Sequence, residues 1–129
     1  MSTIRCDNFG PSAGGTTYSA RGIAKAWVNF NGTGTIAARD SLNVTSLTDV
    51  GTGECLANTT SAMNNGNYSF SGQAAGPTLG ILYSRGSYNA AYRSTTSFGA
   101  GVLYQSTFGG AGTFADCDYV DYKIHGDLA

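Results

Sequence analysis

The stretch Lys25–Gly53, KAWVNFNGTGTIAARDSLNVTSLTDVGTG, alternates short runs of β-favouring residues with glycine-rich turns. It contains the triplet Gly-Thr-Gly twice, at Gly32–Gly34 and at Gly51–Gly53. Asn31-Gly32 can supply the positive φ angles that a type I′ hairpin turn needs. Neither glycine cluster has the spacing and following helix of a phosphate-binding loop. Turns this frequent leave room only for short strands, so the stretch predicts a series of antiparallel hairpins.

The rest of the composition favours the same fold class. The chain holds 19 Gly, eight Tyr, six Phe and one Trp, but only two Lys and one Glu, so most strong helix formers are scarce and strand-favouring aromatics are common. We therefore expect an all-β protein, a small antiparallel β-sandwich. Leu, Ile, Val and Phe account for only 23 of the 129 residues. Because this apolar supply is modest, we expect part of the apolar surface to be buried against copies of the same chain.

Charge and terminal sequence exclude several partners. The formal net charge is −1, with no basic stripe that could neutralise phosphates, so we expect no nucleic-acid binding. No apolar run reaches the length that spans a membrane, so we expect no membrane insertion. The start, MSTIRCDNFGPS, lacks the charged and apolar regions of a signal peptide. We expect synthesis in a cytoplasm.

The chain divides into a leader arm, residues 1–21, and one β domain, residues 22–129. Within the domain the first firm strand is Gly22–Phe30, with Lys25, Trp27 and Asn29 on one face and Ala26, Val28 and Phe30 on the other. About eight strands are expected in all, with bends between them at a spacing typical of a sandwich. They are residues 22–30, 35–47 (kinked near Asp40-Ser41), 54–62, 68–74, 78–84, 90–97, 100–108 and 116–127.

Residues with catalytic potential are few. His125, the one histidine, is near the end of the last expected strand and is interpreted as structural. Asp116, Asp118 and Asp121 cluster in sequence, but alternation places Asp121 on the opposite face from the other two, which indicates a solvated rim rather than an acid pair. We expect no enzymatic activity, no metal site and no cofactor.

The three cysteines give no sign of a disulfide framework. Cys6, Cys55 and Cys117 are odd in number and widely spaced, with no CxxC pair. We interpret them as small buried hydrophobic residues.

A tyrosine- and arginine-rich segment, Leu82–Gly99, is the candidate contact surface. In it aromatic and arginine side chains alternate with Ser, Gly and Asn, a composition typical of adaptable recognition loops. The alternative is that these aromatics line the sandwich or a subunit interface. The candidate receptor-contact residues are Tyr83, Arg85, Tyr88, Tyr92, Arg93 and Phe98.

The region from Gly22 to about Gly72 resembles a small module common in bacteriophage virion proteins, often the C-terminal part of tail fibres in phages of cyanobacteria and other aquatic bacteria. The resemblance rests on the run Lys25–Thr35 (KAWVNFNGTGT), on Asn43-Val44, Thr48-Asp49 and Gly51–Gly53, and on Thr60–Met63 with Asn67-Tyr68. The ending VDYKIHGD and the leader STIRCDNFGPSAGG are also similar. Glu54–Asn58 departs from the family, which usually has a Tyr-Thr-Val-Asn-Phe-like strand there. The chain begins with its own Met and has no fibre shaft before the module, so we expect a stand-alone copy.

The resemblance implies a virion structural protein that assembles as a homotrimer, with Trp27, Val28 or Phe30 near a subunit contact. The leading hypothesis is a tail-fibre or tail-knob component, bound to other tail proteins and contacting a host surface glycan. The alternative is a capsid decoration or cement protein that stabilises the shell. An enzyme that degrades capsule is the third hypothesis, disfavoured because no acid pair or triad is visible.

Overall fold

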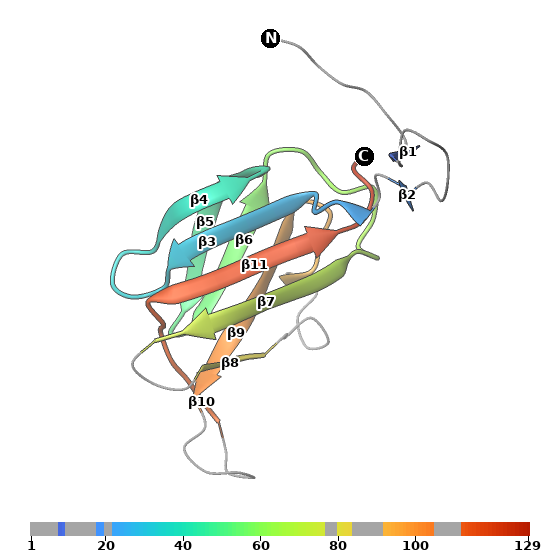
Figure 1. Ribbon diagram of the computed structural model, residues 1–129. Coiled ribbons are helices and arrows are strands. Elements are labelled where there is room, and N and C mark those ends of the chain that lie inside the picture. Colours follow the sequence, from blue (N-terminus) through green and yellow to red (C-terminus); the bar gives the residue numbers. More distant parts are fainter. Residues whose placement is uncertain (1–7, 10–17, 20–21, 77–79, 84–91, 105–111) are drawn as a thin grey trace.

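A computed structural model describes residues 8–9, 18–19, 22–76, 80–83, 92–104 and 112–129. For residues 8–9, 18–19 and 80–83 it describes the backbone alone. The chain forms two antiparallel sheets packed face to face (Figure 1). No α-helix occurs in the described ranges. The expected all-β sandwich is thus confirmed. No helix in these ranges is long and apolar enough to cross a membrane.

The first sheet has four strands in the order β4-β3-β11-β7. Its central pair joins segments far apart in the chain, since Trp27 of β3 faces Lys123 of β11 and Lys123 in turn faces Ser71 of β7. The strands are β3 (Ala26–Asn31), β4 (Ala37–Leu42), β7 (Ser69–Ala75) and β11 (Tyr119–His125).

The second sheet has five strands, in the order β10-β9-β6-β5 with β8 also paired to β9. These are β5 (Val44–Gly51), β6 (Glu54–Thr59), β8 (Gly80–Tyr83), β9 (Ser97–Tyr104) and β10 (Thr113–Phe114). Within the expected leader, β1 (Asn8–Phe9) and β2 (Tyr18–Ser19) pair with each other as a two-stranded ribbon.

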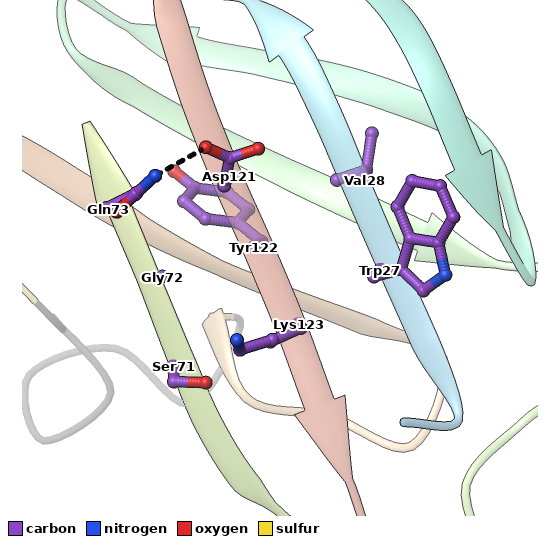
Figure 2. Close-up of a pocket in the computed structure, with 8 residues that line it drawn as sticks. All are labelled: Trp27, Val28, Ser71, Gly72, Gln73, Asp121, Tyr122 and Lys123. Carbon is purple, nitrogen blue, oxygen red and sulfur yellow. Dashed lines mark hydrogen bonds between the residues drawn. The ribbon is translucent and has the colours of Figure 1, made fainter. Parts of the chain in front are cut away.

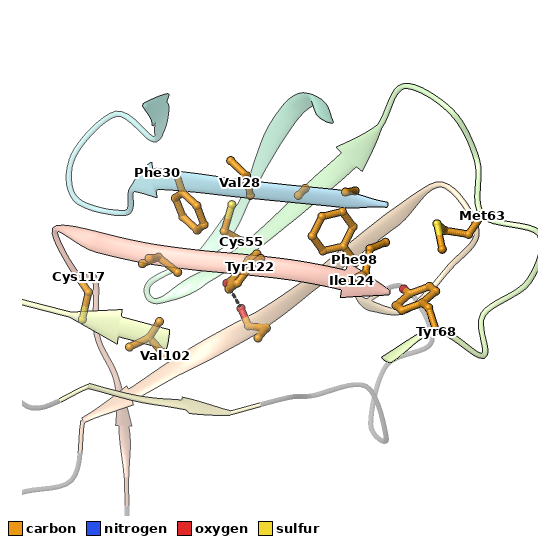
Figure 3. Packing of buried hydrophobic residues seen from close by; sticks show 14 residues of the cluster. Val28, Phe30, Cys55, Met63, Tyr68, Phe98, Val102, Cys117, Tyr122 and Ile124 are labelled. Atoms are coloured by element: carbon orange, nitrogen blue, oxygen red, sulfur yellow. Dashed lines mark hydrogen bonds between the residues drawn. The ribbon is translucent and has the colours of Figure 1, made fainter. Parts of the chain in front are cut away.

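The core lies between the sheets and follows from alternation along the strands. Burial alternates along β3 and β11 as the sequence predicts, with Val120, Tyr122 and Ile124 facing inward. The Tyr122 ring packs edge-on against Phe30 with centroids 5.1 Å apart, and its hydroxyl donates to the Ala100 carbonyl at 2.8 Å, which joins the two sheets (Figure 3). Each such aromatic contributes about 1.5–3 kcal/mol by burial.

Two of the three candidate interface residues belong to this core. Val28 and Phe30 are each only 1% exposed and pack between the sheets. The prediction that they lie at a subunit contact is therefore wrong, because the chain's own second sheet covers them. Trp27 alone of the three faces outward and is half-buried.

The chain passes from one sheet to the other at Asn43, between β4 and β5. Asn43 has a left-handed backbone (φ 55°), which asparagine tolerates better than most residues. Its amide nitrogen donates to the carbonyls of Lys25 and Ser61, and its Oδ1 accepts the Ser61 N–H at 2.7 Å. The single strand expected over residues 35–47 is thus divided here into β4 and β5. The kink expected near Asp40-Ser41 corresponds to a bulge next to Asp40, where β4 shifts its register with β3.

Both Gly-Thr-Gly triplets are turns, and both pack on the crossover segment Ala115–Asp118 that leads from β10 to β11. From the first triplet, Gly32 donates its N–H to the Cys117 carbonyl at 3.0 Å. From the second, Gly53 donates its N–H to Asp116 Oδ1 at 2.6 Å. The turns of two different sheets thus hold one of the two segments that return the chain to the four-stranded sheet, the other being residues 60–68 between β6 and β7.

Two local predictions need correction. The first turn is a five-residue loop whose positive φ lies at Gly34, not a type I′ turn at Asn31-Gly32, because the Asn31 side chain bonds Thr33 and stabilises a wider loop. Residues 92–96, expected within a strand, form a turn in which Ser94 Oγ accepts the N–H groups of Thr96 and Ser97. Serine competes with strand pairing in this way.

Candidate functional site: the outer face of the four-stranded sheet

A row of polar side chains crosses the outer face of the four-stranded sheet. Asn29 Nδ2 donates to Asp121 Oδ1 at 2.6 Å, and Gln73 Nε2 donates to Asp121 Oδ2 at 3.2 Å. These three residues, here called the amide–carboxylate row, face one another on β3, β11 and β7. Because each amide gives an N–H to the same carboxylate, its carbonyl oxygen and second N–H are held in fixed orientations.

The next row on the same face is amphipathic. Trp27 lies between Leu42 on one side and Lys123 on the other, and Ser71 completes the row. Leu42 is 48% exposed. Among the described residues the Lys123 ammonium has no hydrogen-bond or ion-pair partner, so it is free to bind a ligand.

The two rows border a groove of about 420 Å³. Trp27, Lys123, Asp121, Gln73 and Ser71 contribute side chains to it, and backbone of β3, β11 and β7 forms its floor. Figure 2 shows Gln73 bonded to Asp121, Lys123 extending from β11 toward β7, and the indole on the β3 side. The volume of the groove falls within the range of about 300–1,000 Å³ common for small-ligand sites.

A second exposed aromatic lies at the start of β11. Tyr119 is 55% exposed, and the Arg39 guanidinium lies over its ring at 4.2 Å from the centroid. Arg39 is the extra residue of a bulge where β4 leaves its register with β3, and it donates to the carbonyls of Phe30 and Asp118. The bulge directs the arginine across the sheet and fixes the tyrosine ring.

This face can bind but offers little for catalysis. It presents hydrogen-bond donors and acceptors, one free ammonium and two aromatic rings, with no serine–histidine or cysteine–histidine pair in the described ranges. His125 Nδ1 is 3.1 Å from the Gly22 carbonyl, which supports its structural interpretation. No cluster of three potential metal ligands occurs among the described residues.

The described thiols are buried and unreactive. Burial, followed by the nearby charge of Asp49, raises the pKa of the Cys55 thiol from about 9 to about 12. Burial, followed by the charges of Asp118 and Asp116, also raises the pKa of Cys117. Both cysteines are free, as expected of small buried hydrophobic residues, and Cys6 lies outside the described residues.

The structure corrects two of the candidate receptor-contact residues. Phe98 is 0% exposed and packs in the core near Phe70. Tyr92 is 4% exposed, with its hydroxyl donating to Glu54 Oε1. Neither side chain can reach a partner, so for these two the alternative interpretation, that the aromatics line the sandwich, is correct.

Arg93 is exposed but engaged within the chain. It donates to the carbonyls of Gly66 and Tyr68, and its guanidinium lies over the Tyr68 ring at 4.8 Å. It therefore holds the turn before β7 against the turn before β9. Of the remaining candidates, Arg85, Tyr88 and the side chain of Tyr83 lie outside what the structure describes, and their role stays a prediction.

One side of the sandwich is open. β4 and β5 are the edge strands of their sheets, and a groove of about 260 Å³ lies between them. Ile36, Val44 and Leu47 line it while packing against the core, so apolar core surface reaches solvent there.

Alternation along each strand puts Asn29 on the same face as Trp27, and Asp121 on the same face as Lys123. The sequence did not indicate that these two faces form one surface, because Asp121 pairs with Asn29 across about 90 residues and such pairing leaves no local signal. A shared polar alternation in the two strands was the one available clue. Comparisons with protein-family models, with curated proteins and with solved structures find no match to this chain.

Proposed function

We propose that the chain is a bacteriophage virion structural protein, a tail-fibre or tail-knob component that contacts the host cell surface. The observation that carries the proposal is the groove on the outer face of the four-stranded sheet, where Trp27 and fixed polar groups are available to a partner. The sequence resemblance of residues 22–72 to phage fibre modules and the all-β sandwich also support it. The protein would bind rather than catalyse, and would be localised in the virion beside other tail proteins.

The test joins virion localisation with cell adsorption. Immunogold labelling of virions from the phage that encodes the chain is expected to mark the tail, and the labelled chain is expected to adsorb to host cells. Absence from purified virions would overturn the proposal. The double variant Arg85→Ala, Tyr88→Ala tests the predicted contact segment 82–99: loss of adsorption supports that segment, and full adsorption excludes it.

Assembly as a homotrimer is part of the proposal. What supports it is the open side of the sandwich, where β4 and β5 each have one edge that pairs with no other described strand and where apolar side chains reach the surface. Packing a second copy of the chain on this side would bury the strand edges and the apolar side chains. Light scattering after size exclusion is expected to give three chains for the wild type and fewer for Thr45→Lys, which places a charge at this groove. Val50→Lys, on the same strand but outside the groove, is the matched control. A monomeric wild type would overturn the trimer.

The same open side favours one alternative, a capsid decoration protein. Its apolar groove could pack on a capsomer instead of on a second copy. In that case the labelled chain would mark heads rather than tails, would not adsorb to cells, and virions lacking it would lose resistance to heat.

A further inference from the structure

We infer that the outer face of the four-stranded sheet is a carbohydrate-binding site, with Trp27 as the surface on which a pyranose ring packs. The inference deepens the proposed function and rests on it only for the source of the glycan. It also differs from the predicted contact segment 82–99, because every residue it uses belongs to β3, β7 or β11.

The first argument is the pairing of an aromatic ring with fixed polar groups. A sugar ring presents an apolar face of C–H groups and a rim of hydroxyls, each of which donates one hydrogen bond and accepts others. Trp27 supplies the apolar surface. The amide–carboxylate row, one residue pair further along the strands, supplies oriented donors and acceptors at about 7 Å.

The second argument is that these polar groups are already positioned. Asp121 receives an N–H from Asn29 and another from Gln73, so neither amide can rotate without losing a bond to a carboxylate. A ligand hydroxyl therefore meets groups that need no reordering, which lowers the entropic cost of binding. Lys123, facing Trp27 on the next strand, adds a free donor.

The third argument is that the face suits a glycan better than a peptide or a second copy of the chain. A peptide would add to a free strand edge, but β3 and β11 are each paired on both sides. A second copy would favour a contact whose centre is poor in charge, whereas Asp121 and Lys123 lie in the middle of this face. The face also extends beyond the groove, since Tyr119 lies four residues before Lys123 on β11, or about 13 Å. That distance suits a chain of sugars rather than a single ring.

The experiment uses the purified full chain against an array of bacterial surface oligosaccharides, both neutral and uronic-acid-containing, followed by titration calorimetry with the best binder. Wild type is expected to bind at least one glycan. Trp27→Ala is expected to weaken binding by about tenfold or more, and Trp27→Phe by less, because a smaller ring remains. Gln73→Ala is expected to weaken it several-fold. Asn58→Ala is the matched control, since Asn58 is an amide that bridges Ser46 and Thr48 away from this face.

The outcomes are decisive without reference to any phage. No binding by wild type to any glycan on the array overturns the inference, as does binding that Trp27→Ala leaves unchanged. A changed molecular mass for Trp27→Ala would assign the tryptophan to a subunit contact instead. Glycan binding by a chain that is absent from virions would retain this site and reject the proposed function.

Discussion

The two Gly-Thr-Gly turns have the same sequence and opposite constraints. Both end in a glycine with left-handed φ, 61° at Gly34 and 69° at Gly53. A Cβ at Gly34 would meet nothing within 4 Å, whereas at Gly53 it would lie 2.8 Å from backbone atoms of Ala115 and Val102. In the first turn it is the opening glycine, Gly32, that is tightly packed. The comparison shows that a motif fixes backbone shape, while its packing depends on which strands surround it.

Gly53→Ala is expected to have the largest effect. It combines an unfavourable φ with a clash against backbone that cannot move aside, so we expect a loss of about 3 kcal/mol or more in the free energy of unfolding. Urea denaturation followed by tryptophan fluorescence measures it. A loss no greater than that of Gly34→Ala would show that the crossover Ala115–Asp118 yields easily.

Gly32→Ala is expected to come next, at about 1–3 kcal/mol. Its added Cβ would approach the Cys117 carbonyl oxygen to 2.9 Å, whereas a Cβ at Gly22, which also has no left-handed φ, would meet nothing within 4 Å. Gly22→Ala is therefore the control and is expected to cost less. Equal losses in the same denaturation assay would contradict the assignment of Gly32 to a packed position.

Alkaline pH is expected to weaken the crossover that both turns contact. The pKa of Cys117 is raised in the folded chain, so the unfolded chain loses this proton first as pH rises. The contribution of the Cys117 thiol to the free energy of unfolding is complete below the ordinary thiol pKa of about 9. It is lost as the pH rises from that value to the raised pKa, by up to about 1.4 kcal/mol per pH unit. Measured from pH 8 to 11, the stability of wild type is expected to fall relative to Cys117→Ala. A constant difference would exclude the mechanism.

The side chains that support the turns are expected to contribute about 1 kcal/mol each. Asn31 bonds Thr33 within the first loop, and Asp116 accepts the Gly53 N–H in the second. Asp116→Ala is expected to cost more than Asn31→Ala, because its bond is charge-assisted and joins segments 63 residues apart. Thermal unfolding of the two variants gives the ranking, and the reverse order would show that the local loop bonds are the stronger support.

Gly34→Ala is expected to have the smallest effect among the glycines with left-handed φ, about 1 kcal/mol from the backbone alone. Gly34→Asn should recover part of that loss, since asparagine tolerates this conformation. If Gly34→Asn were as unstable as Gly34→Ala, the cost would have to come from a contact rather than from φ.

The sequence predicted the strands in which apolar and polar residues alternate strictly. It did not predict the burial of residues whose environment is set by segments distant in the chain. Val28, Val120 and Tyr122 show period-two alternation, so their shared inward orientation could be inferred. Phe98 could not be placed, because it follows a turn of small polar residues and its burial depends on residues of distant strands, such as Phe70 of β7. Arg93 was taken for a free contact residue because its carbonyl partners, Gly66 and Tyr68, come from a turn about 25 residues away. The candidate site likewise required the pairing of β3 with β11, which no local pattern encodes.

The central position of β11 has a consequence for synthesis. This strand follows β3, β4 and β7 in the chain and so leaves the ribosome after them, yet it lies between β3 and β7 and pairs with both. Until residues 119–125 have emerged, the four-stranded sheet cannot form, and β3 and β7 each have an unpaired edge. During that interval the nascent chain can mispair with other copies of itself, and the native pairing of β3 and β7 has to wait until β11 has been made.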